Sequence, residues 1–196
     1  MAEIALFGGS FDPPHVGHLL AAAWVLATEP VDELWFVPVH EHPLGKKMAA
    51  PFEHRVELCQ LAIADLGLRR ARVSRIEEDL GGEGRTVDLL EHLHQSRPGD
   101  RFALVLGTDL KFERSQWKRF ERIEELARII EVWRGGYPNT LGTRIAAPPL
   151  ITSPSSAALP EISSTQIRAA LSSGADVSHL VPRAVLEAIR AAGTYR

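Results

Sequence analysis

The sequence predicts a doubly wound α/β domain, which is a parallel sheet with helices on both faces, followed by a small helical segment. Short apolar runs alternate with segments of helical periodicity along most of the chain. Such alternation implies right-handed crossovers between parallel strands. The length of 196 residues fits one domain of this kind rather than two. We therefore expect a single domain with a Rossmann-like core in residues 1–147 and a C-terminal segment in residues 148–196.

Each predicted element rests on its own local pattern. Residues 4–7 form an apolar run that ends at two glycines, which is typical of a buried strand. From Val16 onwards apolar residues recur at i, i+3, i+4 and i+7, which indicates a helix. By the same criteria we expect strands at 34–37, 71–76, 102–106 and 129–133, and helices from about residue 51, at 87–93 and around 117–126. The acidic run at 77–79 is interpreted as a solvated turn.

The C-terminal segment has a different character. Its first part, residues 148–160, is rich in Pro, Ser and Ala and leads into helices predicted at 164–171 and 182–192. Gly174 and Gly193 stand where glycines end helices. Ligands of doubly wound sheets bind beyond the carboxyl ends of the strands. We therefore expect the functional site in the segments that follow the first, second, fourth and fifth strands.

The composition excludes several classes of protein. Hydrophobic residues make up 45% and charged residues 24% of the chain, so it is not disordered. With 22 Lys and Arg against 25 Asp and Glu, the net charge of −3 gives no reason to expect nucleic acid as a partner. No apolar run approaches the roughly 20 residues that span a bilayer. Because the N-terminus lacks the basic region of a signal peptide and Cys59 is the single cysteine, we expect a cytoplasmic protein; a homo-oligomer stays open.

The loop after the first strand, GGSFDPPHVGH, is the most informative stretch. Gly8 and Gly9 let a backbone approach a phosphate just before a helix N-terminus, where free N–H groups and the helix dipole favour an anion. His15 and His18 are three residues apart on one face of the first helical turn, so both imidazoles can point to one ligand. Gly17 between them removes a side chain where a flat ligand can lie.

Two other interpretations of this loop stay open. It can be a Gly- and Pro-rich turn that carries two surface histidines. It can also be part of a metal site with His40 and His42 as further ligands, although no acidic or thiolate side chain is spaced to complete such a site.

The loop resembles the H-x-G-H signature of the nucleotidyltransferase superfamily, whose members transfer adenylyl or cytidylyl groups. The whole stretch is similar to the opening of bacterial nicotinate-nucleotide adenylyltransferases. This resemblance implies that His15 and His18 are catalytic groups on the triphosphate of ATP, and that Mg²⁺ screens the polyphosphate. It assigns ATP binding to Gly8, Gly9, Ser10, Phe11 and Gly17.

A second motif, ISSTQIR, lies near the C-terminus. Ser163 can cap the predicted helix, with Gln166 completing a capping box. Ser164 and Thr165 bring hydroxyls and free N–H groups to an anion, and Arg168 adds a charged fork suited to phosphate oxygens. The stretch is similar to the same family's I-S-S-T-x-I-R pattern, which implies that these last three residues bind the β- and γ-phosphates and that the arginine is catalytic. An ordinary capped helix with an exposed arginine is the alternative.

Other residues match the ATP side of the family's site. Gly107 and Asp109 follow a buried strand and resemble its G-x-D pattern, which helps to hold the nucleotide and its metal; a loop-capping aspartate is the alternative. Arg134 resembles the arginine of the family's R-P-G pattern and can reach the adenosine or the phosphates, unless it is merely solvated. Lys46 or Lys47, after the second strand, can supply a further cation. No protein metal ligand is assigned beyond Asp109, so Mg²⁺ is expected to bind through the ATP phosphates.

The mononucleotide side of the site matches the family less closely. Trp117 corresponds to a tryptophan that stacks on the pyridine ring, and Thr86 to a threonine at a helix N-terminus that holds the pyridine carboxylate. Core packing for Trp117 and a plain N-cap for Thr86 are the alternatives. The family's common aromatic residues are replaced by Arg85 and Lys118, and its P-P-H-K pattern is not kept in residues 39–46. These departures leave acid and amide substrates open.

The resemblance implies the reaction of ATP with nicotinate mononucleotide to give deamido-NAD and pyrophosphate. When a phosphate oxygen attacks the α-phosphorus, negative charge gathers on the α-phosphate and on the departing pyrophosphate. Positioned cations and N–H groups stabilise this charge without a protein nucleophile. The alternatives are nicotinamide mononucleotide as the preferred or second substrate, phosphopantetheine adenylylation, and a non-catalytic nucleotide-binding regulator.

Overall fold

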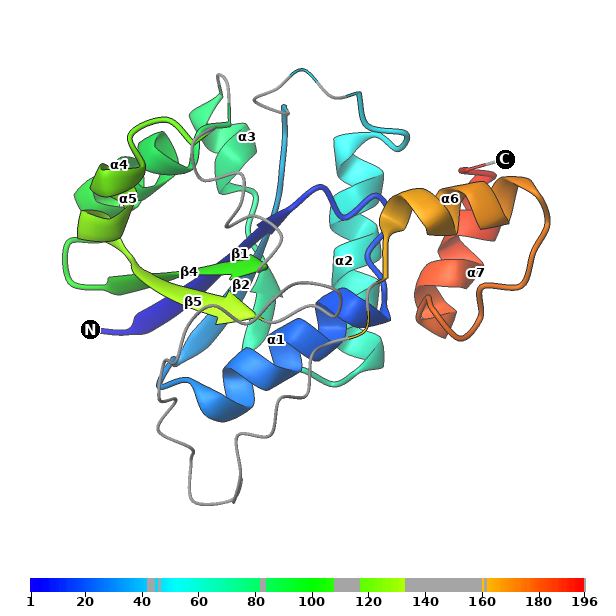
Figure 1. Ribbon diagram of the computed structural model, residues 1–196, viewed down its shortest axis with the longest axis horizontal. Helices are drawn as coiled ribbons and strands as arrows, with labels where there is room; N and C mark the ends of the chain where they lie inside the picture. Colours follow the sequence, from blue (N-terminus) through cyan, green and yellow to red (C-terminus); the bar gives the residue numbers. More distant parts are fainter. Residues whose placement is uncertain are drawn as a thin grey trace.

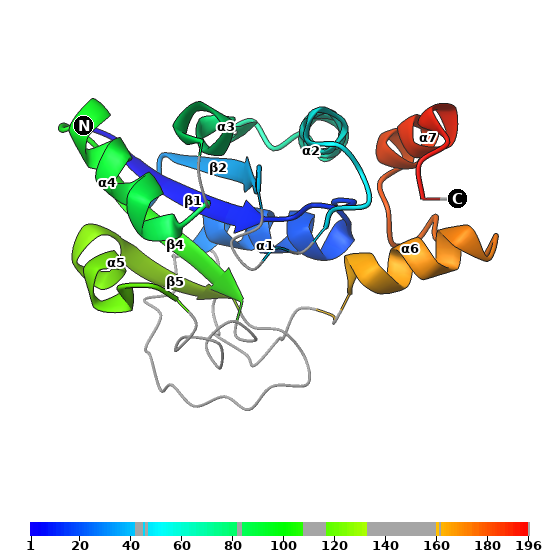
Figure 2. The ribbon, with the colours of Figure 1, turned by 90° about the horizontal axis from the view of Figure 1, so that it is seen from above.

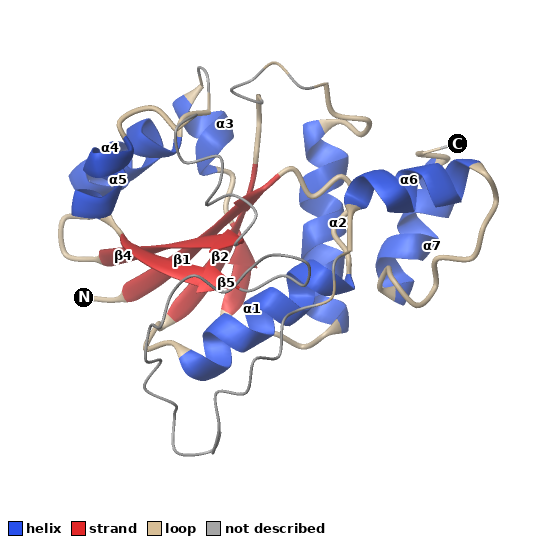
Figure 3. Cartoon of the chain, viewed as in Figure 1, coloured by secondary structure: helices blue, strands red, loops and turns tan. Residues whose placement is uncertain are grey.

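A parallel sheet organises the part of the chain that the computed structural model describes, which is residues 1–41, 45, 47–81, 84–107, 117–132, 160 and 162–195. Its strands are β1 (Glu3–Gly9), β2 (Glu33–Pro38), β3 (Ala71–Val73), β4 (Arg101–Gly107) and β5 (Arg128–Val132). They lie in the order β3-β2-β1-β4-β5, and every neighbouring pair is parallel (Figures 1 and 3). The chain winds outwards from β1 in both directions, so the predicted doubly wound topology is confirmed.

Helices cover both faces of this sheet (Figure 2). The helices of the described residues are α1 (Val16–Thr28), α2 (Phe52–Asp65), α3 (Ile76–Leu80), α4 (Thr86–Ser96), α5 (Phe120–Leu126), α6 (Ser164–Ser172) and α7 (Arg183–Ala192), of which the first five flank the sheet. Side chains alternate along β1 and divide the core in two. Ala5 and Phe7 belong to the apolar cluster of α1 and α2, whereas Ile4 and Leu6 belong to the cluster of α3, α4 and α5.

The two C-terminal helices extend the domain beyond the sheet. Figure 1 shows α6 and α7 on the far side of α2 from the strands, and α7 packs against α2. Ile167 of α6 and Ile189 of α7 join the apolar cluster that contains α1 and α2. The predicted glycine stops are confirmed, because Gly174 and Gly193 adopt positive φ angles of 74° and 67° just after the two helices.

The segment after β3 differs from its prediction. The strand ends at Val73, and the acidic run expected to be a solvated turn lies in α3. Glu77 in this run is only 8% exposed. Its carboxylate accepts a hydrogen bond of 3.1 Å from the backbone N–H of His40, 37 positions away. The prediction from the local charge pattern was wrong because the partner that allows burial is distant in sequence.

Some predicted features lie outside the described residues. These are Lys46, His42, Asp109 and the range 133–159, which contains Arg134. Among the residues that the structure does describe, no helix has the length and apolar character needed to cross a bilayer.

Candidate active site

The loop between β1 and α1 is built around a buried aromatic side chain. Phe11 adopts a positive φ of 46° and is fully buried against the rings of Phe7, Phe36 and His18, at centroid distances of 5.6, 5.3 and 4.9 Å. A Cβ atom on Gly9 would lie 3.1 Å from the Phe11 ring, so a larger residue would crowd this packing. The Phe11 side chain supports the loop from within the core, and a contact of Phe11 with ATP must come from its backbone.

The two histidines of the first motif stack on each other at the start of α1. Their ring centroids are 3.7 Å apart with an interplanar angle of 24°. His15 is the N-cap residue, is 2% exposed, and donates its backbone N–H to Nδ1 of His18 at 3.2 Å. Because Nδ1 accepts, a neutral His18 carries its proton on Nε2, and the protonated ring keeps the same N–H. His18 therefore has an N–H donor at Nε2 in either charge state, as a phosphate ligand requires.

Gly17 allows the two motifs to approach each other. A Cβ atom at this position would lie 3.1 Å from Cε1 and Nδ1 of His15 and 3.5 Å from Cβ of Ile162. A side chain at position 17 would therefore crowd the His15 ring and the segment that leads into α6, so the close packing of the two motifs requires a glycine here.

The N-terminus of α6 is capped and is attached to the first motif. The Ser163 hydroxyl accepts from the backbone N–H of Thr165 at 3.2 Å, whereas a capping box requires the N–H of Gln166. Ser163 is thus the N-cap as predicted, without the box. Ser164 donates its hydroxyl to the carbonyl oxygen of Pro13 at 2.9 Å. That bond uses the Ser164 proton, so the backbone N–H is the donor that this residue can offer to a phosphate.

Arg168 completes the junction between the motifs. Its Nη1 donates to the carbonyl oxygen of Asp12 at 2.7 Å, and its Nη2 donates to the Thr165 hydroxyl at 3.2 Å. Asp12 and Arg168 are 156 positions apart in the sequence. The contact brings the N-termini of α1 and α6 together with a guanidinium group, and each of these features favours an anion.

Asp12 is a structural centre that the sequence patterns did not single out. The residue is 3% exposed. Its carboxylate accepts hydrogen bonds from the backbone N–H groups of Ala49 and Ala50, at 2.7 and 3.0 Å, and from the Tyr195 hydroxyl at 2.7 Å. The one signal was its place inside the first motif, but its partners are 37 to 183 positions away.

Arg55 of α2 fixes the loop between β1 and α1, which we call the phosphate loop after its expected role, from the inside. It is 1% exposed and donates to the carbonyl oxygens of Ser10 at 2.8 Å, Val39 at 2.7 Å and Ala50 at 3.3 Å. Burial lowers the pKa of the Arg55 guanidinium from its ordinary value. This residue too was missed from the sequence. Its signal was a basic side chain on the apolar face of a helix, one turn before the buried Cys59.

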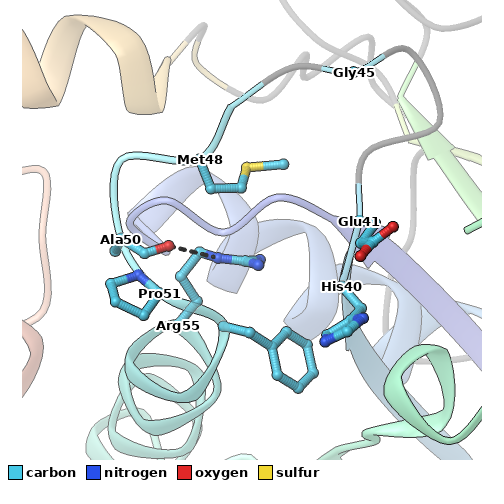
Figure 4. Close-up of a pocket in the computed structure, with 8 residues that line it drawn as sticks. His40, Glu41, Gly45, Met48, Ala50, Pro51 and Arg55 are labelled. Carbon is cyan, nitrogen blue, oxygen red and sulfur yellow. Dashed lines mark hydrogen bonds between the residues drawn. The ribbon is translucent and has the colours of Figure 1, made fainter. Parts of the chain in front are cut away.

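A cavity of about 390 Å³ lies beside this loop, where β2 ends and α2 begins (Figure 4). Its lining residues are His40, Glu41, Gly45, Met48, Ala50, Pro51, Phe52 and Arg55. The His40 ring meets the Phe52 ring edge to face at 4.8 Å, and the Arg55 guanidinium lies 5.5 Å from the same ring. The cavity thus combines a guanidinium, an imidazole and an aromatic ring next to the phosphate loop.

The predicted mononucleotide residues lie on the face of the sheet that α3, α4 and α5 cover, opposite the face of α1 and α2. Thr86 is the first residue of α4 and Arg85 is its N-cap, so Thr86 begins the helix as predicted and is not a plain N-cap. Trp117 is half-buried against the apolar cluster of α4 and α5, with its ring 6.0 Å from that of Phe120. Gly107 ends β4 at the carboxyl edge of the sheet.

Metal ligands do not gather in the described part of the site. Within those ranges, no three His, Cys, Asp or Glu side chains lie close enough together to hold an ion. The groups that surround the phosphate loop are mainly N–H donors, which suit phosphate oxygens.

The switch point of the sheet thus brings together two helix N-termini, a histidine pair and an arginine. Residues 6–170 match the family model described as cytidylyltransferase-like. The match spans both motifs of the site, from β1 to α6.

Relatives narrow the assignment further. A protein of Anaeromyxobacter dehalogenans named "Probable nicotinate-nucleotide adenylyltransferase" is 48% identical over 197 residues, which cover 99% of this chain and 97% of the relative. A protein of the same name from Thermus thermophilus is 40% identical over 194 residues, covering 99% of this chain and 100% of the relative. A solved Plasmodium falciparum nicotinic acid mononucleotide adenylyltransferase complexed with NaAD has the same fold, with a TM-score of 0.76 at 20% identity over 100% of this chain and 98% of that one. The chain belongs to the cytidylyltransferase-like family, in its group of nicotinate-nucleotide adenylyltransferases.

Proposed function

We propose that this chain transfers the adenylyl group of ATP to nicotinate mononucleotide, giving deamido-NAD and pyrophosphate. One observation carries the proposal, which is the direct contact of the two phosphate motifs through the 2.7 Å hydrogen bond from Arg168 to the Asp12 carbonyl. This contact gathers the stacked histidines, two helix N-termini and a guanidinium at the switch point of the sheet. The names of the relatives support the choice of substrates.

The transfer is a displacement at the α-phosphorus of ATP. A phosphate oxygen of the mononucleotide forms the new bond, and the bond from the α-phosphorus to the bridging oxygen of the β-phosphate breaks, so that pyrophosphate leaves with the electron pair. His18 offers its Nε2–H, α1 and α6 offer backbone N–H groups, and Arg168 offers its guanidinium to the charge that develops on these oxygens. No protein nucleophile takes part, because the mononucleotide phosphate itself attacks and the site has only to hold both substrates in line.

Mg²⁺ is proposed to enter with the polyphosphate, where it neutralises charge between the phosphates. The donor set of the described site fits this, because it offers N–H groups to phosphate oxygens and leaves the ion to those oxygens. Asp109 stays the candidate protein ligand. Gly8, where a Cβ would have no neighbour within 4 Å, leaves open space for the nucleotide. The other proposed ATP-binding residues are Gly9, Ser10, Phe11, Gly17, Lys46, Gly107, Arg134, Ser164 and Thr165.

The acid substrate is proposed to be recognised at the N-terminus of α4. Thr86 occupies the first helical position, where backbone N–H groups have no partner in the helix and favour a carboxylate. Trp117 packs on the same apolar cluster as Val87 of α4, which suits a pyridine ring stacked beside that helix end. Arg85 adds a positive charge at the N-cap position.

Pyrophosphate release from ATP and Mg²⁺ tests the function, with nicotinate and nicotinamide mononucleotides compared side by side. We expect kcat/KM to favour the acid by at least about tenfold, because hydrogen bonds from a helix N-terminus to a carboxylate are stronger than those to a neutral amide. Equal or better use of the amide would contradict acid recognition at α4. Pyrophosphate release with phosphopantetheine as the sole active acceptor would make the chain a phosphopantetheine adenylyltransferase. ATP binding without any release would make it a non-catalytic nucleotide-binding regulator.

A pair of variants at one position separates backbone from side-chain recognition. Thr86→Ala keeps the N–H group, so the preference for the acid should persist. Thr86→Pro removes that N–H while keeping the helix, because proline is favoured at the first helical position and Arg85 already has the extended backbone that a following proline requires. Thr86→Pro should therefore lose the preference, whereas a loss already present in Thr86→Ala would mean that the hydroxyl and not the helix end recognises the carboxylate.

We also propose a cytoplasmic location, which the use of a single cysteine supports. Nucleotides are the proposed partners, and the oligomeric state is left to direct measurement. Sedimentation of the purified chain at several concentrations would determine that state.

A further inference from the structure

Tyr195 returns from the end of α7 to the phosphate loop. Gly193 adopts a φ of 67° and turns the chain, and Thr194 then donates its backbone N–H to the carbonyl of Ile189 at 3.2 Å. Tyr195 itself has a positive φ of 64°, in a region that side-chain-bearing residues rarely adopt. It is 9% exposed, and its carbonyl accepts from the Ser172 hydroxyl at 3.1 Å. The contacts of the buried ring and of the Tyr195 carbonyl thus stabilise an unfavourable backbone conformation.

The Tyr195 hydroxyl reaches the buried carboxylate of Asp12. It donates to Oδ1 at 2.7 Å, while the N–H groups of Ala50 and Ala49 donate to Oδ1 and Oδ2 at 3.0 and 2.7 Å. All three donors are uncharged. Burial and the hydrogen bond to Asp12 raise the pKa of Tyr195 above its ordinary value, so the hydroxyl keeps its proton and donates it.

Arg168 is the charged group next to the same carboxylate. Its Nη1 lies 3.9 Å from Oδ2 of Asp12, beyond hydrogen-bond distance, and 2.7 Å from the Asp12 carbonyl oxygen, to which it donates. Neutral donors thus satisfy the carboxylate, and the guanidinium is held by a backbone carbonyl instead. A guanidinium has five N–H donors. Held in this way, Arg168 can direct its remaining donors to a phosphate.

We propose that Tyr195 is a positioning residue for the triphosphate, acting through Asp12 on Arg168. Without the hydroxyl, the buried Asp12 carboxylate lacks one donor, and Nη1 of Arg168 is close enough to replace it. The guanidinium then turns from the triphosphate towards Asp12. The inference rests on the proposed function only in that Arg168 meets the triphosphate of ATP.

Titration calorimetry with ATP and Mg²⁺, in the absence of mononucleotide, tests the proposal on the full chain. Tyr195→Phe keeps the ring and removes the hydroxyl, and we expect the Kd for ATP to rise about tenfold. Arg168→Met should also raise the Kd. The double variant should bind ATP within about twofold of Arg168→Met, because the tyrosine acts only through that arginine. Because no transfer occurs in this experiment, its result for Tyr195 holds even if pyrophosphate release refutes the proposed reaction.

Two further variants separate positioning from general stability. Ser173→Ala removes a hydroxyl that donates to the Ala170 carbonyl at 2.9 Å on the same helix end, without a contact to Asp12, and should bind ATP as the wild type does. Ser172→Ala loosens the backbone of Tyr195 and keeps its hydroxyl, so it should weaken ATP binding in the same direction by a smaller factor. This variant also keeps the proposal testable if Tyr195→Phe folds poorly.

Three results would overturn the proposal. They are unchanged ATP affinity in Tyr195→Phe, a double variant in which the two losses multiply, and a loss in Ser173→Ala as large as in Tyr195→Phe. The second would mean that Tyr195 and Arg168 act independently, as expected if the tyrosine merely anchors the C-terminal helices.

Discussion

Substitutions of His18 can separate the two roles that the structure gives to its imidazole. Nδ1 accepts the backbone N–H of His15 at 3.2 Å and so caps α1, whereas Nε2 carries the proton proposed to meet the triphosphate. Asparagine places an amide oxygen near the position of Nδ1 and has no group at Nε2. His18→Asn therefore keeps the cap and removes the proposed catalytic donor, whereas His18→Ala removes both.

The expected magnitudes follow from these contacts. Loss of one donor to the developing charge lowers kcat by about 100- to 1,000-fold, and both variants should show it. Loss of the cap costs about 1 kcal/mol of unfolding free energy. Loss of the stacked ring, at 3.7 Å from His15 and 4.9 Å from Phe11, costs roughly 0.5–1.5 kcal/mol more. We therefore expect a destabilisation of about 2 kcal/mol for His18→Ala and about 1 kcal/mol for His18→Asn.

Pyrophosphate release at saturating substrates measures kcat, and urea unfolding measures the free energy. His18→Gln is the reverse control, because its amide reaches towards the Nε2 position but supplies no cap acceptor. It should retain more turnover than His18→Asn and lose more stability. The reasoning would be refuted by a His18→Asn variant that turns over within about threefold of the wild type, because His18 would then be a structural cap alone.

Three other substitutions test the surroundings of the site. Arg55→Met leaves three loop carbonyls without their donor, so it should lower the free energy of unfolding by about 3 kcal/mol or more and weaken ATP binding. An unfolding midpoint in urea equal to that of the wild type would contradict this. Burial raises the pKa of Glu77 to about 7 from its ordinary value of 4.5. Between these two pH values the folded state holds a proton that the unfolded state has released. The free energy of unfolding should therefore fall by about 3 kcal/mol as the pH rises from 4.5 to 7. Glu77→Gln should flatten that dependence, and an equal slope in both proteins would assign it to another group. Trp117→Ala should raise KM for the mononucleotide more than KM for ATP, and the reverse pattern would make Trp117 a core residue.

Local patterns predicted the elements that depend on local chemistry. The buried strands read as apolar runs, α1 begins where its 3.6-residue periodicity begins, and Gly193 ends α7 in the left-handed conformation that the glycine signal predicts. Ser163 was expected to be an N-cap and is one. In each of these cases the deciding interactions lie within a few residues of one another.

Local patterns could not predict the burial of residues whose hydrogen-bond partners are distant in sequence. Glu77 looked solvated because nothing near it in sequence reveals the His40 N–H that it binds. Asp12 and Arg55 are charged residues that local reasoning leaves at the surface, yet each is buried by contacts 5 to 183 positions away. The resemblance to a family paired the two phosphate motifs, but the hydrogen bonds that join them became visible only in the fold.

The proposed anion site must also be stable before its anion arrives, and the contacts of Asp12 bear on this stability. Two guanidinium groups act on Asp12, since Arg168 donates to its carbonyl oxygen and the buried Arg55 lies within electrostatic reach of its carboxylate. Asp12 lies 3.9 Å from Arg168, and its charge opposes the lowering of the Arg55 pKa that burial causes. A free carboxylate would also repel a triphosphate, but here two backbone N–H groups and the Tyr195 hydroxyl surround it. These neutral donors satisfy the carboxylate. A bidentate pair with Arg168 would satisfy it too, but it would use the N–H groups of Arg168 that the proposed phosphate needs. The same arrangement thus offsets the positive charge of the two guanidinium groups and leaves donors of Arg168 for the proposed phosphate.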